Sequence, residues 1–353
     1  MIRRLIILLL IVGCEEVLEP EDCAGVAGGT ATEDICGVCN GDESSCNVIS
    51  INDYNFMKDR YFFIDETFKN NFYPLNEFSQ HIFDPNYVIG EFELYQKIVS
   101  PHPAMILADA YLDPLNPYSY SVVGNWVKLE ENMDYDIDRI LGYIRIKSVY
   151  NAIAIAYTTT SFDFDNQTFG AVQDTTNGTT FKSIYHDCME SSTDYSEQCI
   201  ITLKLLKDIN PSTPNTPTWP LMFKNVYSLG GSNINANDLK IEIVLNLGNN
   251  ETAHSDNGNS YSSIFGLLLD RYNDLDGNGI IDIYESIINL TYGELMLPYH
   301  FPFAYDETNI LGNSHEDLIE LLNPISDDSP AIYYSTNQND IEAETKFSIK
   351  IIH

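Results

Sequence analysis

Residues 142–157 read Gly-Tyr-Ile-Arg-Ile-Lys-Ser-Val-Tyr-Asn-Ala-Ile-Ala-Ile-Ala-Tyr, and this stretch decides the fold class. Residues 142–147 and 151–157 are both rich in apolar side chains, and a short turn-like segment separates them. Short apolar runs that are broken by turn residues are typical of β-strands. The stretch therefore predicts two neighbouring strands.

The same pattern of short apolar runs and turn residues continues through most of the chain. Residues 239–243 and 347–351 alternate apolar and polar side chains, so each segment is expected to place one face on a core. From about residue 52 onward, short apolar runs, many Tyr and Phe residues and frequent Asn, Asp, Pro and Gly breaks predict strands joined by turns. Helical periodicity is scarce, and its best candidate is residues 315–322.

These patterns predict a mainly β protein of antiparallel sheets, with one or two sandwich-like units and few short helices, after a Cys-rich stalk. Residues 170–218 are expected to form loops around one strand at 200–206, and to divide the folded body that follows the stalk into two subdomains. We expect a first β-rich subdomain over residues 51–190 and a second over residues 191–353.

The N-terminal residues have the pattern of an export signal. Two arginines precede an apolar run over residues 5–12, which is shorter than the roughly 20 residues that a bilayer-spanning helix needs. Residues 11–14, Ile-Val-Gly-Cys, resemble the lipobox of bacterial lipoproteins, which implies removal of residues 1–13 and acylation of Cys14. This predicts an outer-membrane lipoprotein, on the cell surface or the periplasmic face. The alternative is an ordinary signal peptide that ends near a cysteine.

The chain has seven cysteines, and a lipid on Cys14 leaves an even number. In an exported protein an even set indicates disulfides, because the compartment is oxidising. Residues 14–50 are predicted to form a disulfide-rich stalk, which resembles short modules in envelope proteins of marine bacteria. Its four cysteines allow three pairings, and the competing interpretation of Cys36-Gly-Val-Cys39 is a zinc or redox site. The disulfide candidates are Cys23, Cys36, Cys39, Cys46, Cys188 and Cys199.

The formal net charge is −34, from 52 acidic and 18 basic residues. Such an acidic surface repels phosphate backbones, which excludes nucleic acid as a partner, and it favours cations. Hydrophobic residues make up 44% of the chain, which is enough to build a core. The sequence contains no G-x-S-x-G elbow, H-E-x-x-H helix, Walker loop or dinucleotide fingerprint. We therefore expect a protein that is not an enzyme.

One segment carries a specific chemical motif, a twelve-residue calcium-type loop over residues 274–285. Oxygen-bearing residues stand at positions 1, 3, 5 and 9, with glycine at position 6 and glutamate at position 12. Extracellular loops of this type bind Ca²⁺ at about 10⁻⁴ to 10⁻³ M, so the ion is expected to be a structural brace. The alternative is an acidic Asn-Gly turn between two strands. The predicted calcium ligands are Asp274, Asp276, Asn278, the carbonyl of Ile280, Asp282 and Glu285.

Ordered segments in both halves of the chain form a family pattern. One set begins with Pro217-Thr-Trp-Pro-Leu-Met-Phe-Lys-Asn-Val-Tyr-Ser-Leu-Gly230 and continues through residues 238–243, 267–271, 276–282 and 293–298. The other set runs through residues 72–75, 84–85, 130–137, 141–144 and 154–157. Together they resemble the N-terminal repeat domain of SprA, a family of outer-membrane translocon proteins of type IX secretion and gliding motility. Pro220 and Asn132 depart from the Asp and Gly that are usual in that family.

Members of that family are very long chains that form a wide outer-membrane barrel, and 353 residues are too few to enclose its pore. The resemblance therefore implies kinship and location, without translocation itself. We expect either a stand-alone lipoprotein, which acts as an accessory or scaffold component among envelope proteins of a gliding-motility and type IX secretion assembly, or a truncated translocon frame. The alternative function is a calcium-dependent surface adhesin or glycan-binding protein, favoured by the loop and by paired aromatics such as Tyr333 and Tyr334.

Overall fold

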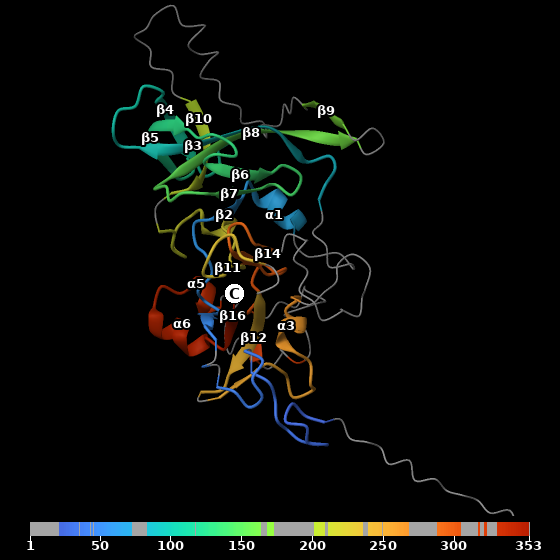
Figure 1. Cartoon of the computed structure of the whole chain (residues 1–353). Coiled ribbons are helices and arrows are strands. Elements are labelled where there is room, and N and C mark those ends of the chain that lie inside the picture. Colours follow the sequence, from blue (N-terminus) through green and yellow to red (C-terminus); the bar gives the residue numbers. More distant parts are fainter. Residues whose placement is uncertain are drawn as a thin grey trace, which may run out of the picture.

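The computed structural model describes residues 21–34, 36–42, 44, 46–72, 83–116, 118–163, 168–172, 201–208, 211–235, 239–248, 250–267, 288–304, 317, 321–322 and 330–352. Among the residues that the structure describes, strands account for 37% and helices for 12%, which confirms the predicted β class. The sheets are mostly antiparallel and the helices are short. Figure 1 shows the sheets stacked along the molecule, with the widest sheet at one end and the stalk at the other.

The sheet at the upper end of Figure 1 closes on itself as a small barrel. Its strands are β3 (Val88–Ile98), β4 (Ile106–Tyr111), β5 (Ser121–Lys128), β8 (Ile153–Asp163), β9 (Thr168–Val172) and β10 (Ile201–Lys207). The order is β10-β4-β5-β3-β8, β8 pairs back with β10 to close the ring, and β9 extends it. The β10–β4 pair is parallel and the other barrel pairs are antiparallel.

Strand β8 separates the barrel interior from the larger core of the body. Its Ala154 faces the barrel interior, whereas Ile153 and Ile155 belong to the larger core. Successive side chains of a strand point to opposite faces, so the alternation of Ala and Ile puts the small residues inside. Trp126 is fully buried in the barrel and donates its Nε1–H to the carbonyl of Ala108 at 3.2 Å. Five strands enclose little space, which explains why alanines pack beside the large rings of Trp126 and Tyr95.

Three smaller sheets make up the rest of the body, and all their strand pairs are antiparallel. The first contains β2 (Tyr61–Phe63), β7 (Tyr143–Ile146) and β6 (Tyr135–Asp138). The second contains β11 (Val226–Ser228), β15 (Glu294–Met296) and β14 (Ile288–Asn289). The third contains β1 (Ile49–Asn52), β16 (Phe347–Ile352), β12 (Lys240–Asn246) and β13 (Glu251–Thr252). The described helices are α1 (Glu66–Phe72), the 3₁₀ helix η1 (Trp219–Leu221), α3 (Tyr261–Ile264), α5 (Ala331–Tyr334) and α6 (Gln338–Glu344).

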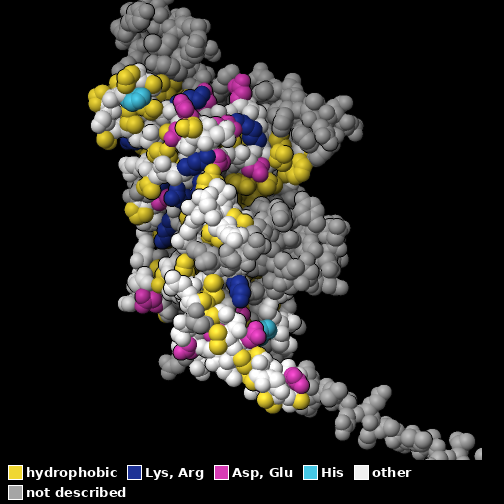
Figure 2. All heavy atoms as spheres, viewed as in Figure 1, with side chains coloured by type: hydrophobic (Ala, Val, Ile, Leu, Met, Phe, Trp, Pro, Cys, Tyr) yellow, Lys and Arg dark blue, Asp and Glu magenta, His cyan; other side chains and the backbone are white. Residues whose placement is uncertain are grey.

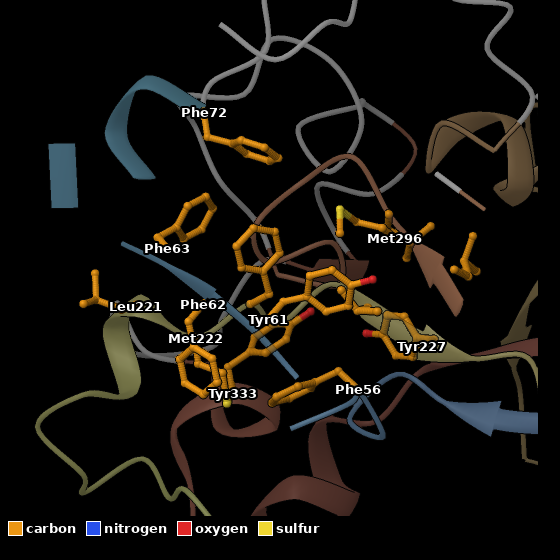
Figure 3. Close-up of a cluster of buried hydrophobic side chains, with 14 of the residues drawn as sticks. Phe56, Tyr61, Phe62, Phe63, Phe72, Leu221, Met222, Tyr227, Met296 and Tyr333 are labelled. Atoms are coloured by element: carbon orange, nitrogen blue, oxygen red, sulfur yellow. The ribbon is translucent and has the colours of Figure 1, made fainter. Parts of the chain in front are cut away.

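An aromatic core joins these three sheets. Figure 3 shows side chains from distant parts of the chain converging on one space, among them Phe56, Tyr61, Tyr227 and Tyr333. Phe63 belongs to the same cluster, and its ring lies 5.2 Å from that of Phe72 on α1 in an edge-to-face arrangement. Aromatic pairs of this kind contribute about 0.5–1.5 kcal/mol beyond the burial of their area. Shared ring packing therefore contributes to holding the sheets together.

The two alternating segments predicted near the C-terminus pair with each other. Ile241 and Ile243 of β12 lie opposite Ile351 and Ile349 of β16, and all four are buried. Strand β12 buries one face more than the other, as its alternation predicts. Strand β16 is buried on both faces; on the polar face Lys350 forms an ion pair with Glu251 and Ser348 donates to Asn52.

Strands from both sides of residue 190 share sheets. Strand β10 follows that residue and closes the barrel of β3, β4, β5 and β8, which precede it. Strand β1 near the N-terminus pairs with β16 at the C-terminal end, with Ile51 opposite Ile349. The division predicted between residues 190 and 191 therefore coincides with no boundary between sheets in the described ranges.

Candidate functional site

One face of the β2-β7-β6 sheet carries polar and aromatic side chains in register. Tyr61 pairs with Arg145, and Arg145 pairs with Asp136, so the three lie in one row across the strands. Residues two apart in a strand share a face, so the next row on this side contains Tyr143 and Asp138. The sheet therefore presents two acids, a guanidinium and two phenols to the same space.

Arg145 forms a buried ion pair with Glu294 of β15, which joins two of the sheets. Its Nε donates to Oε2 at 2.8 Å and its Nη2 to Oε1 at 2.7 Å, a two-pronged geometry that is among the strongest in proteins. The side chains are 9% and 3% exposed. Tyr61 donates its hydroxyl to the same carboxylate at 2.7 Å. Burial, and then the charge of Glu294, raise the pKa of Tyr61 well above its ordinary value, so the phenol keeps its proton.

Tyr292, in the turn between β14 and β15, covers Arg145. The guanidinium carbon lies 3.5 Å from the centre of the Tyr292 ring, a close cation–π contact. The Tyr292 hydroxyl donates to Asp136 at 3.0 Å, and Lys147 forms an ion pair with the same carboxylate at 2.7 Å. The hydrogen bond that the Lys147 ammonium donates to Asp136 raises the pKa of Lys147. The ring is thus held by one face and by its hydroxyl.

An open cavity of about 700 Å³ lies over this face. Its volume is within the range of about 300–1,000 Å³ that is usual for small-molecule sites. Burial raises the pKa of Tyr143 well above its ordinary value, so its hydroxyl is a neutral donor and acceptor. The polar and aromatic lining includes Asp136, Asp138, Arg139, Tyr143, Asn289 and Tyr292.

The charged groups around the cavity are held by the protein itself. Asp138 accepts the backbone amides of Ile140 and Leu141 at 2.9 and 2.8 Å. Arg139 donates to Glu131 at 2.6 Å and to the carbonyl of Gly90 at 3.0 Å. On the face that Figure 2 shows, acidic and basic side chains are interspersed over the upper part of the molecule, despite the net charge of −34. The arrangement suits the binding of a ligand by preformed hydrogen-bonding groups.

A second polar cluster is closed to solvent. Ser212 donates its hydroxyl to Asp59 at 2.5 Å, and Lys207 donates to the carbonyls of Tyr150 and Asn151 at 2.7 and 2.9 Å. Burial lowers the pKa of Lys207 to about 8. Ser212, Asp59 and Lys207 are all buried, so a ligand has no access to them. The cluster instead fixes the junction between the barrel and the aromatic core.

The stalk is stapled by two disulfides. Cys23 is bonded to Cys39 and Cys36 to Cys46, with Cα–Cα distances of 5.5 and 5.7 Å. These separations are ordinary for disulfides. Of the three pairings that the sequence left open, the structure therefore adopts the one with two overlapping loops. Cys36 and Cys39 belong to different bridges, which differs from the pairing of a C-x-x-C redox site.

The stalk also contains a repeat that the sequence analysis missed. Residues 21–29 and 33–41 form the same turn: the amide of Asp22 donates to the carbonyl of Val26 at 3.0 Å, and Asp34 does the same to Val38 at 2.9 Å. In both copies the aspartate carboxylate accepts the amide of the valine, at 2.9 Å each. The two Glu-Asp pairs that open the copies, each followed by Gly-Val, are the signal that could have revealed it.

Several predicted sites lie outside the described residues. These are the lipidation site Cys14, the calcium-type loop 274–285 with all its ligands, and Cys188 with Cys199. Of the predicted helix 315–322, the described Asp317, Leu321 and Leu322 are helical and the other residues lie outside as well. Within the described ranges, no group of three or more His, Cys, Asp or Glu side chains is placed to hold a metal ion. In the same ranges, no helix is long and apolar enough to cross a bilayer.

No protein-family model matches the chain, and no curated protein matches it either. The likeness to the SprA family therefore stays a prediction. The cavity beside β6 was missed by sequence reasoning, although a signal existed. Arg145 and Glu294 are charged residues that stand next to apolar ones inside short strands, Ile144-Arg-Ile146 and Glu294-Leu-Met296. A charge in such a position must find a partner across the core.

Proposed function

We propose that this chain is a non-enzymatic lipoprotein of the bacterial cell envelope, anchored in the outer membrane by acyl chains on Cys14. Its β body serves as an accessory or scaffold component of a gliding-motility and type IX secretion assembly. It contacts other envelope proteins, and the stalk holds it away from the lipid surface.

The observation that carries this proposal is the disulfide-stapled stalk. Both bridges lie between the candidate lipid anchor and β1, the strand that enters the body at Ile49. Disulfides persist in oxidising compartments, so the stalk supports export from the cytoplasm. A segment of this length without core residues is too small to fold on hydrophobic burial alone, and the cross-links replace that missing stabilisation.

Lipidation is tested by metabolic labelling with an alkyne analogue of palmitate in a Gram-negative host. The wild-type chain is expected to be labelled and to sediment with outer membranes, and Cys14→Ser is expected to lose both properties. Cys23→Ser is the matched control, because it changes a stalk cysteine and should leave the label in place. Unlabelled wild-type protein in the cytosol, with reduced stalk thiols, would contradict the proposal.

The role in an assembly is tested separately by crosslinking in a host that carries a type IX system, followed by solubilisation in mild detergent. The tagged protein is expected to recover components of the secretion or motility machinery. Recovery of the same proteins by the Cys14→Ser variant at equal yield would show that membrane placement does not matter. Recovery of none of them would refute the scaffold role.

A calcium-dependent adhesin is the second candidate. One observation favours it: the calcium-type loop ends at Glu285, shortly before β14, whose Asn289 lines the open cavity. A bound ion at the loop would brace the chain as it enters that strand. Adhesion of cells that display the protein is expected to fall on addition of a calcium chelator and to return with added Ca²⁺. Adhesion that is unaffected by the chelator would exclude this candidate.

A further inference from the structure

The cavity beside β6 combines phenol rings with closely spaced hydrogen-bonding groups. Tyr61, Tyr143 and Tyr292 all contribute to its wall. The Tyr292 ring has one face against the Arg145 guanidinium, so the ring is fixed in orientation before a ligand arrives. A ring held in this way offers a flat apolar surface at low cost in conformational entropy. Such a surface suits a ligand with a flat patch of C–H groups.

The charges around the cavity balance each other, although the whole chain is strongly acidic. Among the lining residues, two carboxylates, Asp136 and Asp138, face two guanidinium groups, Arg139 and Arg145. Their ion-pair partners Lys147, Glu131 and Glu294 leave a net charge of only −1 around the site. A ligand with a large net charge therefore meets no excess of the opposite sign. A carboxylate has about four lone-pair sites, so Asp136 keeps acceptor capacity beyond Lys147 and Tyr292. The lining suits a neutral ligand that carries several hydroxyl groups.

The cavity is accessible from the side of strand β6. This strand is at the edge of its sheet, with β7 as its neighbour. The side chain of Asp136 is 35% exposed, and Ile140 at the rim is 37% exposed. Asn289 of β14 adds an amide whose Oδ1 accepts the backbone N–H of Tyr292 at 3.1 Å and whose NH₂ group can donate to a ligand. A ligand can therefore enter from solvent and meet donors, acceptors and a ring within one site.

We propose that this cavity binds an uncharged oligosaccharide. The C–H face of a sugar ring packs on Tyr292. Its hydroxyls hydrogen-bond to Asp136, to the Tyr143 hydroxyl, and to Arg139 and Asn289. Sugars combine an apolar ring face with dense hydroxyl groups, and this pairing of surfaces is what the cavity offers. The site binds without cleaving, and it would give a protein held at the cell surface a way to recognise glycans.

The test uses the purified full-length protein in mild detergent on an array of neutral, sialylated and sulfated oligosaccharides, followed by calorimetry with the strongest hit. Binding is expected among the neutral sugars. Tyr292→Ala is expected to weaken it about tenfold, the loss of one stacking ring. Asp136→Asn and Tyr143→Phe are expected to weaken it while keeping the shape of the wall. Tyr118→Ala is the matched control, because this tyrosine is 95% exposed on the loop between β4 and β5.

Three results would overturn the proposal: no binding to any neutral sugar, binding restricted to the charged ones, or equal losses in the cavity variants and in Tyr118→Ala. Asp136→Asn and Tyr143→Phe keep the test decisive if Tyr292→Ala does not fold. The assay needs neither lipidation nor a membrane. A negative result therefore leaves the anchoring proposal intact, and an unlabelled Cys14 leaves the saccharide site intact.

Discussion

The ion pair between Arg145 and Glu294 connects strand β7 of the β2-β7-β6 sheet to strand β15. Glu294→Ala removes both oxygens that accept from the guanidinium, and it removes the acceptor of the Tyr61 hydroxyl as well. The Arg145 side chain is 9% exposed, so water replaces the lost carboxylate poorly. The variant therefore keeps a buried positive charge and a buried hydroxyl without their shared partner.

The cost follows from that uncompensated charge. Breaking a buried pair by removing one partner costs about 3–5 kcal/mol, because the remaining ion stays desolvated. The Tyr292 ring still covers the guanidinium, so we expect the lower part of this range, about 3 kcal/mol. In a chain of this size, about 2 °C of melting temperature accompanies each kcal/mol, so the midpoint should fall by about 6 °C.

The assay is urea unfolding of the oxidised protein, with two comparison variants. Lys128→Ala breaks an ion pair with Glu93 in which the lysine side chain is 55% exposed, and it should cost no more than about 1 kcal/mol. The double variant Arg145→Met with Glu294→Leu leaves no buried charge and should recover much of the loss. If Glu294→Ala cost no more than Lys128→Ala, the buried pair would not be holding the sheets together.

Three further predictions concern a buried acid, the stalk and one glycine. Burial raises the pKa of Asp53 to about 6, so the native state keeps this proton at pH values where the unfolded chain releases it, near 3.8. The contribution of Asp53 to the free energy of unfolding should therefore fall by about 3 kcal/mol at most as the pH rises from about 4 to 6, and it should stay constant above pH 6. Urea titrations at several pH values should show this step in the difference between the unfolding free energies of the wild type and of Asp53→Asn. A difference that does not change with pH would refute the prediction. Replacing Cys36 and Cys46 by serine should speed proteolysis between residues 21 and 46. The unfolding midpoint of the body should not change, because neither hydrophobic core contains a residue of that segment. A lower midpoint would contradict this prediction. Gly293 has φ +63°, and an added Cβ would overlap the carbonyl oxygen of Gly231, so Gly293→Ala should lower the free energy of unfolding by about 2 kcal/mol or more in thermal unfolding. Gly258 also has a positive φ, +86°, but open space around it, so Gly258→Ala should cost only about 1 kcal/mol. Equal costs would count against the clash.

The strands could be predicted because their signal is local. Residues 239–243 and 347–351 alternate apolar and polar side chains, and the structure makes strands of both. The strand expected at 200–206 is present as β10. Periodicity also indicated that 151–157 is a strand, but its two buried faces serve two different cores, which a run of Ala and Ile does not reveal.

The candidate site was harder to predict because its parts are far apart in the chain. Arg145 and Glu294 are 149 residues apart and meet only because β7 and β15 pack against the same aromatic core. The charged residue within each strand was visible in the sequence, yet neither pattern names its partner. The lining of the cavity likewise combines β6 with the turn after β14.

The sequence by itself determined the β class of this protein and the even set of stalk cysteines, since both follow from residue type and spacing along the chain. The tertiary structure alone decided the disulfide pairing, the closure of the barrel through β10 and β8, and the cavity beside β6. A strand shows locally that one of its faces must be buried, but many partners can bury it. Which partner does so depends on the packing of the whole chain, and the site exists only where those choices meet.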